Sequence, residues 1–182
     1  ATATSNASAA VDYGVIDVLE PPVINGEPEV DEPVTIEPGA LAPSPKTTTV
    51  QWYAAGKVID GATDWTFVPG QEHIDKKLTA KISAKLTGYK AASVVTPASA
   101  KVLAGTITVA AESSIAGKAK VGSVLSVKPG SYEPADATAT YTWLRNGVPV
   151  AQGTSYKLTS ADLRSTIAVR TELSRAKYRA HS

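Results

Sequence analysis

Residues 141–150 read Tyr-Thr-Trp-Leu-Arg-Asn-Gly-Val-Pro-Val, and this stretch decides how the rest of the chain is interpreted. Alternation places Tyr141, Trp143 and Arg145 on one face of a strand. Asn146-Gly147 follows directly, and these two residues tolerate the positive φ angles that a type I′ hairpin turn needs. The stretch therefore predicts a β-hairpin that carries one core tryptophan.

An earlier copy of this hairpin, residues 50–59, reads Val-Gln-Trp-Tyr-Ala-Ala-Gly-Lys-Val-Ile. A shift of 91 positions superposes Trp52 on Trp143, Gly56 on Gly147, Gly14 on Gly105, and Pro38-Gly39 on Pro129-Gly130. After the hairpin the offset falls to 89, and the two extra residues of the first copy are expected in the turn after Phe67. Up to that turn the shift of 91 is expected to hold, so it matches Trp65 with Tyr156 and Phe67 with Leu158. The chain is thus predicted to be a tandem duplication.

A repeat of about 90 residues, with short alternating runs and frequent turn signals, has the size and rhythm of an immunoglobulin-like sandwich domain. We therefore predict an all-β chain of two tandem immunoglobulin-like antiparallel β-sandwich domains, residues 14–103 and residues 104–182. Trp52 and Trp143 are expected as core anchors. Only Leu103-Ala104 separate the last strand of the first domain from the second, which predicts a restricted hinge and a rod-like pair.

Residues 1–13 fall outside both predicted domains, and the shift of 91 lays them over residues 92–104. The coinciding pairs include Ala7-Ser8 with Ala98-Ser99 and Val11 with Val102. The first residues therefore resemble the last strand of a preceding repeat, or form an N-terminal tail, and the second domain is predicted to lack its final strand. Excision from a longer array would explain both ends. Alternatively, residues 1–11 could fill the final-strand position in another molecule by strand addition.

The composition argues against several kinds of site. The 182 residues include no Cys and only two histidines, His73 and His181, so disulfides are excluded and we expect no cofactor and no metal. Five acids between Glu27 and Glu37 raise the question of calcium, but the matching residues 118–128 are basic, and a structural metal would be expected in both copies. No run of 18 apolar residues exists that could span a membrane.

The sequence contains no catalytic motif of a known kind. It has no Gly-x-Ser-x-Gly elbow, no P-loop and no Gly-x-Gly-x-x-Gly. The acids cluster in a segment whose repeat partner lacks them, which argues against the paired carboxylates of a glycosidase. Asp162, which precedes the strand expected to face Trp143, is interpreted as a turn former and not as an acid catalyst. We therefore expect no enzyme activity.

Charge and aromatic residues leave binding functions open. Residues 1–75 hold 12 acids and 2 bases, whereas residues 76–182 hold 5 acids and 16 bases. These charges are either solvated faces or a dipole whose basic part meets an anionic cell-wall polymer. Tyr53, Tyr89 and Tyr178 are candidate ligand-binding residues for a polysaccharide, although they could equally cap the rim of the core. Basic residues are not interleaved with stacking aromatics, so no nucleic-acid binding is expected.

Several motifs occur together in the second domain: Lys120-Val121-Gly122, Pro129-Gly130, Tyr141-Thr142-Trp143-Leu144-Arg145-Asn146-Gly147 and Ala161-Asp162. As a set they resemble the tandem immunoglobulin-like repeats of actinobacterial secreted and cell-surface proteins, although Tyr132 and Arg164 replace the usual Trp and Gly. The resemblance implies a noncatalytic extracellular module, secreted or attached to the cell surface, that serves as a spacer, display or adhesion segment. Two alternatives stay open: an accessory carbohydrate or cell-wall binding module of a secreted hydrolase, and a self-assembling surface subunit joined by strand addition.

Overall fold

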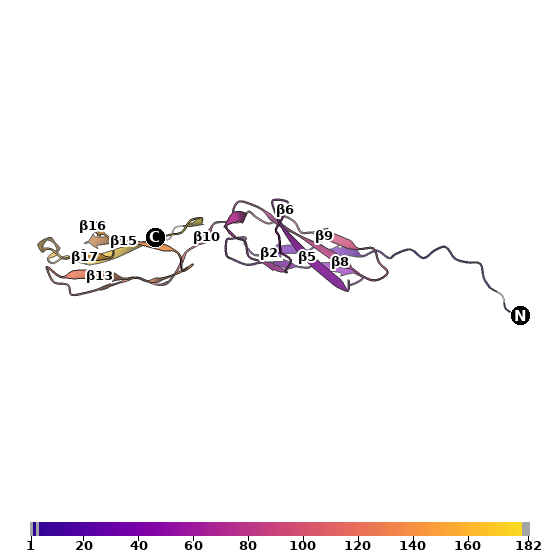
Figure 1. Ribbon diagram of the computed structural model, residues 1–182, viewed down its shortest axis with the longest axis horizontal. Coiled ribbons are helices and arrows are strands. Elements are labelled where there is room, and N and C mark those ends of the chain that lie inside the picture. Colours follow the sequence, from indigo (N-terminus) through magenta and orange to yellow (C-terminus); the bar gives the residue numbers. More distant parts are fainter. Residues whose placement is uncertain (1, 3, 180–182) are drawn as a thin grey trace. The chain divides into compact units, whose positions relative to one another are not determined.

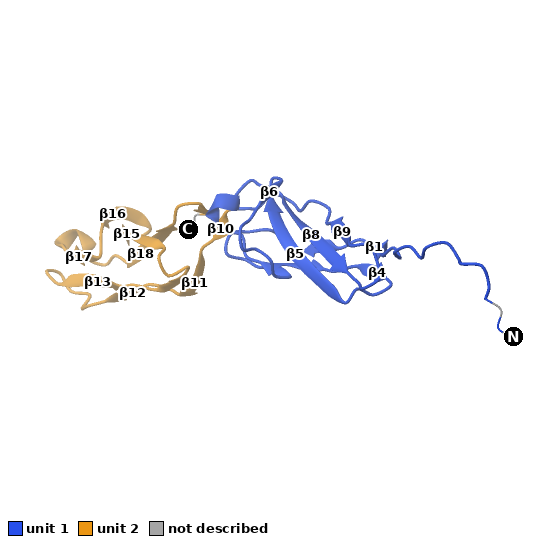
Figure 2. Ribbon diagram, turned by 45° about the vertical axis from the view of Figure 1, so that its right-hand side comes forward, with its two compact units in different colours: residues 1–103 blue, residues 104–182 orange. Residues whose placement is uncertain are grey.

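The computed structural model describes residues 2 and 4–179 of the chain (Figure 1). The chain divides into two compact units, residues 1–103 and residues 104–182 (Figure 2). Within the described residues, the only regular structure besides β-strands is two single-turn 3₁₀ helices, η1 (Gln71–His73) and η2 (Ser160–Asp162). The predicted all-β class is confirmed.

Unit 1 contains two antiparallel sheets and one additional strand pair. One sheet has the order β2-β3-β7, the other has the order β6-β5-β8-β9, and β1 pairs with β4. The strands are β1 (Asp17–Glu20), β2 (Val23–Asn25), β3 (Val34–Glu37), β4 (Ala40–Ala42), β5 (Thr47–Ala54), β6 (Lys57–Val58), β7 (Thr66–Phe67), β8 (Leu78–Lys85) and β9 (Ala92–Val95).

Unit 2 repeats this plan with one strand fewer in the sheet that carries the tryptophan. Its sheets have the orders β12-β13-β17 and β16-β15-β18, while β11 pairs with β14 and β10 runs parallel to β19. The strands are β10 (Gly105–Thr106), β11 (Thr108–Ala111), β12 (Ser114–Ala116), β13 (Val124–Lys128), β14 (Ser131–Glu133), β15 (Thr138–Arg145), β16 (Val148–Gln152), β17 (Ser155–Lys157), β18 (Ile167–Ser174) and β19 (Tyr178–Arg179).

The strand order identifies the architecture of both units. The tryptophan hairpin and the long strand after it form one sheet, and the strands that precede and follow the hairpin form the other. This exchange of consecutive strands between two facing sheets is the Greek-key connection of an immunoglobulin-like sandwich. The predicted pair of tandem immunoglobulin-like antiparallel β-sandwiches is confirmed.

The core of each unit centres on its hairpin tryptophan. Trp52 and Trp143 have no exposed surface, and each indole N–H donates to a backbone carbonyl, that of Asp64 at 2.8 Å and that of Gly153 at 2.9 Å. On β8 every second side chain is buried, as expected for a strand with one face on a core. Both predicted core anchors are confirmed.

The hairpin turns adopt the predicted type I′ conformation. Asn146 and Gly147 have φ angles of 48° and 81°, and Ala55 and Gly56 have φ angles of 48° and 78°. Positive φ at both central residues matches the right-handed twist of the flanking strands. Unit 1 achieves this turn with alanine, which adopts positive φ less readily than asparagine.

The structure corrects the predicted alignment of the two copies after the hairpin. Val34 on β3 pairs with Phe67, and the matching Leu125 on β13 pairs with Tyr156. Phe67 and Tyr156 are therefore equivalent, and their rings lie 5.4 and 5.7 Å from the core tryptophans. Trp65, which the sequence matched with Tyr156, is 37% exposed. The two extra residues of unit 1 therefore lie before Trp65, in the loop after β6. The length of this loop, and not the aromatic character of a residue, determines which residue pairs with β3.

Candidate functional site

The segment after β8 in unit 1 covers the outer edge of that strand. β9 pairs with the second half of β8, and residues 96–103 continue along the first half. Thr96 Oγ1 accepts a hydrogen bond from the N–H of Ala80 at 3.0 Å, and Ser99 Oγ accepts one from the N–H of Leu78 at 2.9 Å. Beyond β9, where this segment no longer forms a regular strand, two side-chain hydroxyls thus accept the hydrogen bonds that backbone carbonyls of a neighbouring strand would otherwise accept.

The end of the same segment seals the core of unit 1. Val102 is 1% exposed, and its carbonyl accepts a hydrogen bond from the N–H of Asp75 at 3.0 Å. Leu103 lies against the connection between β2 and β3, because its carbonyl accepts from the N–H of Val30 at 3.1 Å and its N–H donates to the carbonyl of Pro28 at 2.8 Å. Residues 102–103 therefore join the turn before β8 to the connection between β2 and β3.

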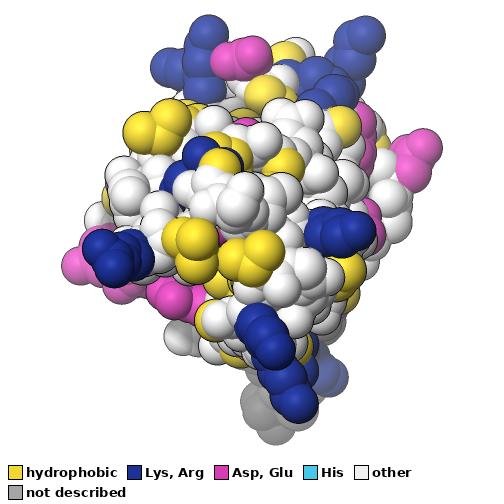
Figure 3. All heavy atoms as spheres, turned by 90° about the vertical axis from the view of Figure 1, so that its left-hand side faces the viewer, with side chains coloured by type: hydrophobic (Ala, Val, Ile, Leu, Met, Phe, Trp, Pro, Cys, Tyr) yellow, Lys and Arg dark blue, Asp and Glu magenta, His cyan; other side chains and the backbone are white. Residues whose placement is uncertain are grey.

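Unit 2 presents an open groove at the matching position. A cavity of about 600 Å³ is lined mainly by apolar side chains, and we call it the β18 groove. It is defined by Ile115, Val121, Leu125, Leu158, Leu163 and Ile167. Val121 is 44% exposed and Leu163 is 64% exposed, whereas Val30, the counterpart of Val121, is 2% exposed. Figure 3 views the left end of Figure 1, where exposed hydrophobic side chains lie among lysine and arginine side chains.

The outer edge of β18 carries unpaired backbone groups, and this edge begins at the groove with Ile167. The N–H of Asn146 donates to the carbonyl of Thr166 at 2.9 Å. Together with the register of β15 and β18, this bond shows which residues of β18 direct their backbone groups toward β15. The N–H groups of Ile167 and Val169 therefore point away from β15. No strand among residues 2 and 4–179 pairs with that edge. An extended segment could add to it by ordinary β-pairing.

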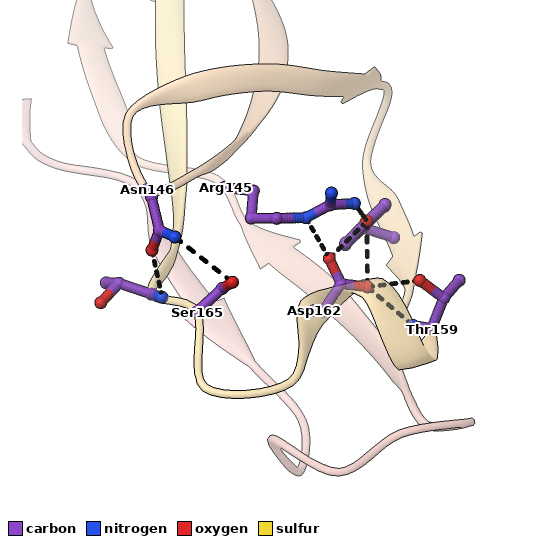
Figure 4. A network of polar contacts seen from close by, with 7 residues as sticks. Arg145, Asn146, Thr159, Asp162 and Ser165 are labelled. Atoms are coloured by element: carbon purple, nitrogen blue, oxygen red, sulfur yellow. Dashed lines mark hydrogen bonds and ion pairs between the residues drawn. The ribbon is translucent and has the colours of Figure 1, made fainter.

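A polar network lies beside the groove (Figure 4). The carboxylate of Asp162, whose side chain is 2% exposed, accepts hydrogen bonds from the N–H of Thr159 at 2.7 Å and from Nε of Arg145 at 2.7 Å. The hydroxyls of Thr159 and Tyr156 also donate to it, each at 2.9 Å. The Thr159 N–H, and then the Arg145 guanidinium and the two hydroxyls, hold the pKa of Asp162 well below its usual range despite the opposing effect of burial. Asp162 thus stays ionised and fully bonded, as its interpretation as a turn former requires.

Unit 1 fills the position of Asp162 with His73. His73 is 7% exposed, and its Nδ1 accepts a hydrogen bond from the N–H of Gly70 at 2.9 Å. Its ring contacts Phe67 edge-on at 5.3 Å. The counterpart of Arg145 is Ala54, so unit 1 has no equivalent of the Arg145–Asp162 pair, and the carboxylate nearest His73 is that of Glu72 at 3.3 Å. The same turn is held by an imidazole in one unit and by a carboxylate in the other.

The three candidate ligand-binding tyrosines occupy separate places. Tyr53 is half-buried on β5 opposite Thr79, whereas Tyr89 follows the other end of β8, so the two lie roughly 20 Å apart along the sheet. The ring of Tyr89 packs on Gly14, where a side chain would collide with it, and Tyr178 packs on Gly105 in the same way. The guanidinium of Arg175 lies 4.1 Å from the Tyr178 ring centroid. Tyr53 and Tyr89 therefore do not form one stacking platform.

The sequence interpretation missed the Arg145–Asp162 ion pair. One signal was present, because alternation already placed Arg145 on the inward face beside Trp143. An inward arginine requires a buried partner, and Asp162 was the only acid between residues 137 and 171. No group of three or more His, Asp or Glu residues within residues 2 and 4–179 could hold a metal ion. Nor does that part of the chain contain a helix long and apolar enough to cross a membrane.

Comparisons with known proteins add little to the fold. No protein-family model matches the chain, and no curated protein matches it. Among solved structures, the chain is similar to one titled "Tandem Ig repeats of Dlar", with 14% sequence identity, 88% of this chain and 95% of that chain covered, and a TM-score of 0.22. A TM-score this low carries no argument, so the immunoglobulin-like assignment rests on the strand order of each unit.

Proposed function

We propose that the chain is a noncatalytic immunoglobulin-like module that serves as a spacer, display or adhesion segment of a larger secreted or cell-surface protein. The observation that carries this proposal is the state of Asp162. It is the only acid lining the cavity of about 600 Å³, and both of its carboxylate oxygens accept hydrogen bonds from the fold. A carboxylate that stays ionised and fully bonded cannot shuttle a proton for catalysis.

The motifs that resemble actinobacterial surface repeats serve packing and turning in this chain. Trp143 fills the core, Asn146 and Gly147 form the hairpin turn, and Asp162 holds η2. Trp143 and Asp162 are buried, and the amide of Asn146 bonds to Ser165 and Thr166 across the turn, which supports a module whose role is architectural. Extracellular location belongs to the same proposal, and antibody labelling of intact cells that carry the parent protein tests it.

The connection between the units supports the spacer role. Leu103 is bridged to Glu29, and Gly105 already pairs with Tyr178, so Ala104 alone lies between paired residues. A one-residue connection leaves few backbone torsions at which the units could move independently. Small-angle X-ray scattering should give a narrower distance distribution for the natural chain than for a variant with eight Gly and Ser residues inserted after Ala104. Equal distributions would contradict the spacer role.

Carbohydrate or cell-wall binding stays a separate prediction. Tyr89 lines a cavity of about 300 Å³ together with Lys46 and Lys85, which could accept an anionic sugar or polymer. Pull-down with insoluble polysaccharides and bacterial cell walls, at low and high salt, tests this function. Retention that survives salt and is lost in Tyr89→Ala would favour a stacking site, whereas retention lost in salt alone would favour the basic residues.

A further inference from the structure

We propose that a cavity beside Trp65 in unit 1 binds an uncharged pyranose sugar, whose ring stacks on the indole. The cavity has a volume of about 300 Å³, and we call it the Trp65 cavity. Residues of β4, β5 and β8 and of the connections on either side of β4 form its walls, including Pro38, Leu41, Ser44, Pro45, Thr48 and Ile82. The proposal goes beyond the spacer role and does not depend on it, because it assigns a ligand to a side chain that the spacer role does not use.

The fold uses the backbone of Trp65 and not its side chain. The N–H of Ile36 donates to the carbonyl of Trp65 at 2.8 Å, and in unit 2 the N–H of Val127 donates to the carbonyl of Thr154 at 2.9 Å. Ile36 and Val127 are equivalent under the shift of 91, so Trp65 and Thr154 occupy the same position in the two units. Since a threonine makes the same backbone bond, the fold does not account for a tryptophan at this position.

The core position beside Trp65 is already filled by another aromatic ring. Phe67 packs on Trp52 with 5.4 Å between the ring centroids, and Trp52 has no exposed surface. Trp65, by contrast, is 37% exposed and lines the cavity. An indole that neither the core nor the backbone requires, and that borders an open cavity, is the kind of exposed aromatic surface that marks a binding site.

The walls of the cavity supply polar groups that suit a sugar. Alternation along β5 places Thr48 on the same face as the buried Val50 and Trp52, so its hydroxyl faces the space between the two sheets. Ser44 lines the same cavity, and both residues are exposed. A hydroxyl both donates and accepts hydrogen bonds, as the hydroxyls of a sugar do. The cavity thus combines an aromatic face with a few polar groups, the usual composition of a small-ligand site.

The absence of charge on the walls selects the class of sugar. Among the described residues that line the Trp65 cavity none is charged, whereas Lys46 and Lys85 line the cavity of Tyr89. An uncharged ring is therefore the better fit beside Trp65. The flat faces of a glucose-type pyranose carry C–H groups, whose partial positive charge suits the negative face of an indole, while its hydroxyls project from the ring edge.

The size of the cavity favours a sugar over a proline-rich peptide, which also stacks on tryptophan. Proline-rich segments bind along elongated grooves lined by aromatic side chains. The Trp65 cavity has one aromatic residue among its described walls, and its volume of about 300 Å³ lies at the lower end of the range for small-ligand sites. It therefore suits a single ring better than an extended segment.

Fluorescence quenching can detect a ligand at this site in the natural chain. Trp52 and Trp143 have no exposed surface, so a neutral quencher such as acrylamide reaches chiefly Trp65. Hexasaccharides of glucose, mannose and xylose are the probes, and we expect at least one of them to protect Trp65 from the quencher in a saturable manner. No protection by any of the three would refute the proposal. Protection by a proline-rich peptide alone would assign the cavity to peptides and would also refute it.

Replacement of Trp65 by the residue of unit 2 gives the sharpest variant. Trp65→Thr should keep the cooperative melt of unit 1, because Thr154 makes the same backbone bond, and should weaken sugar binding in calorimetric titrations by roughly tenfold or more. Trp65→Phe should restore part of the affinity, since it returns an aromatic face. Unchanged affinity in Trp65→Thr would contradict the proposal. Binding that survives in Trp65→Thr but is lost in Tyr89→Ala would place the sugar in the cavity of Tyr89 and would refute the site.

Two threonines that are neighbours on β5 test the polar contacts. Thr48→Val should weaken sugar binding by about two- to tenfold, the scale of one hydrogen bond. Thr49→Val is the matched control, because Thr49 is exposed on the opposite face of the same strand and should have no effect. Equal losses in the two variants would show that the sugar does not lie in the Trp65 cavity.

Discussion

The outer edges of β8 and β18 show how one repeat produces two different surfaces. In unit 1 the edge is paired with β9 and then covered by residues 96–103, and Ala80 on β8 has no exposed surface. In unit 2 the matching Val169 is half-buried, and the apolar residues around it reach solvent. Since the sandwiches share their strand order, the difference arises from the edge segment and not from the fold.

The two units also differ in how they hold the turn before the edge strand. In unit 1 the backbone of Asp75, just after η1, bonds to Val102 of the covering segment. In unit 2 the carboxylate of Asp162 in η2 pairs with Arg145 on β15 at 2.7 Å. The ion pair ties one wall of the β18 groove to the sheet beneath it. The groove is thus held in shape by unit 2 itself.

Removal of the core tryptophans should produce the largest loss in both units. Trp143→Ala should cost about 3 to 5 kcal/mol, because it removes a fully buried indole and leaves a cavity. That loss approaches the whole stability of a small domain, so the unfolding transition of unit 2 should disappear from calorimetric scans while that of unit 1 persists. Trp52→Ala should do the reverse. Cooperative melting near that of the natural chain in either variant would refute the core assignment.

A matched pair of valine truncations should separate the covered edge from the open one. Val102→Ala should destabilise unit 1 by about 2 kcal/mol, because Val102 is 1% exposed. Val11→Ala should change the stability of the dilute chain by less than about 0.5 kcal/mol, because Val11 is 96% exposed. Urea unfolding measures both. Similar losses in the two variants would mean that Val11 is already buried in the isolated molecule.

Acid should destabilise unit 2 through Asp162. The pKa of Asp162 is lowered in the folded state, chiefly by the hydrogen bond from the N–H of Thr159. The ionised carboxylate therefore stabilises unit 2 fully above the pKa of an unfolded aspartate, about 4, and this contribution is lost as the pH falls from there toward the folded pKa. Asp162→Asn should lower the melting temperature of unit 2 at neutral pH and flatten its dependence on pH below 4. Urea titrations at several pH values compare the two chains. An unchanged acid profile would exclude this carboxylate as the cause.

The smallest expected effect is a gain of stability at the hairpin turn of unit 1. Ala55→Asn should stabilise unit 1 by roughly 0.5 to 1 kcal/mol, because asparagine adopts positive φ more readily than alanine. Asn146→Ala should destabilise unit 2 by more than that, since the amide oxygen of Asn146 also accepts a hydrogen bond from the N–H of Thr166 at 2.8 Å. A loss of stability in Ala55→Asn would show that the positive φ angle of Ala55 does not strain the turn of unit 1.

Much of the architecture could be predicted because it depends on local chemistry. The Trp143 strand and the Asn146-Gly147 turn are specified by alternation and by φ preference, which are properties of neighbouring residues. The shift of 91, which falls to 89 after the hairpin, then extends them to both copies. These features require no knowledge of tertiary contacts.

Other features could not be predicted because they depend on distances between segments. Trp65 was matched with Tyr156 on aromatic character, but the loop after β6 places Phe67 in the register with β3 instead. The ion pair of Arg145 with Asp162 joins residues that are 17 positions apart, and no local pattern specifies it. Whether the edge of β18 is open is likewise a property of the folded sheet.

Amide exchange at the two edges tests the central claim most directly. In a dilute solution, the N–H groups of Ile167 and Val169 should exchange about 100-fold or more faster than those of Leu78 and Ala80, which donate to hydroxyls of the covering segment. Equal protection at both edges would contradict the account.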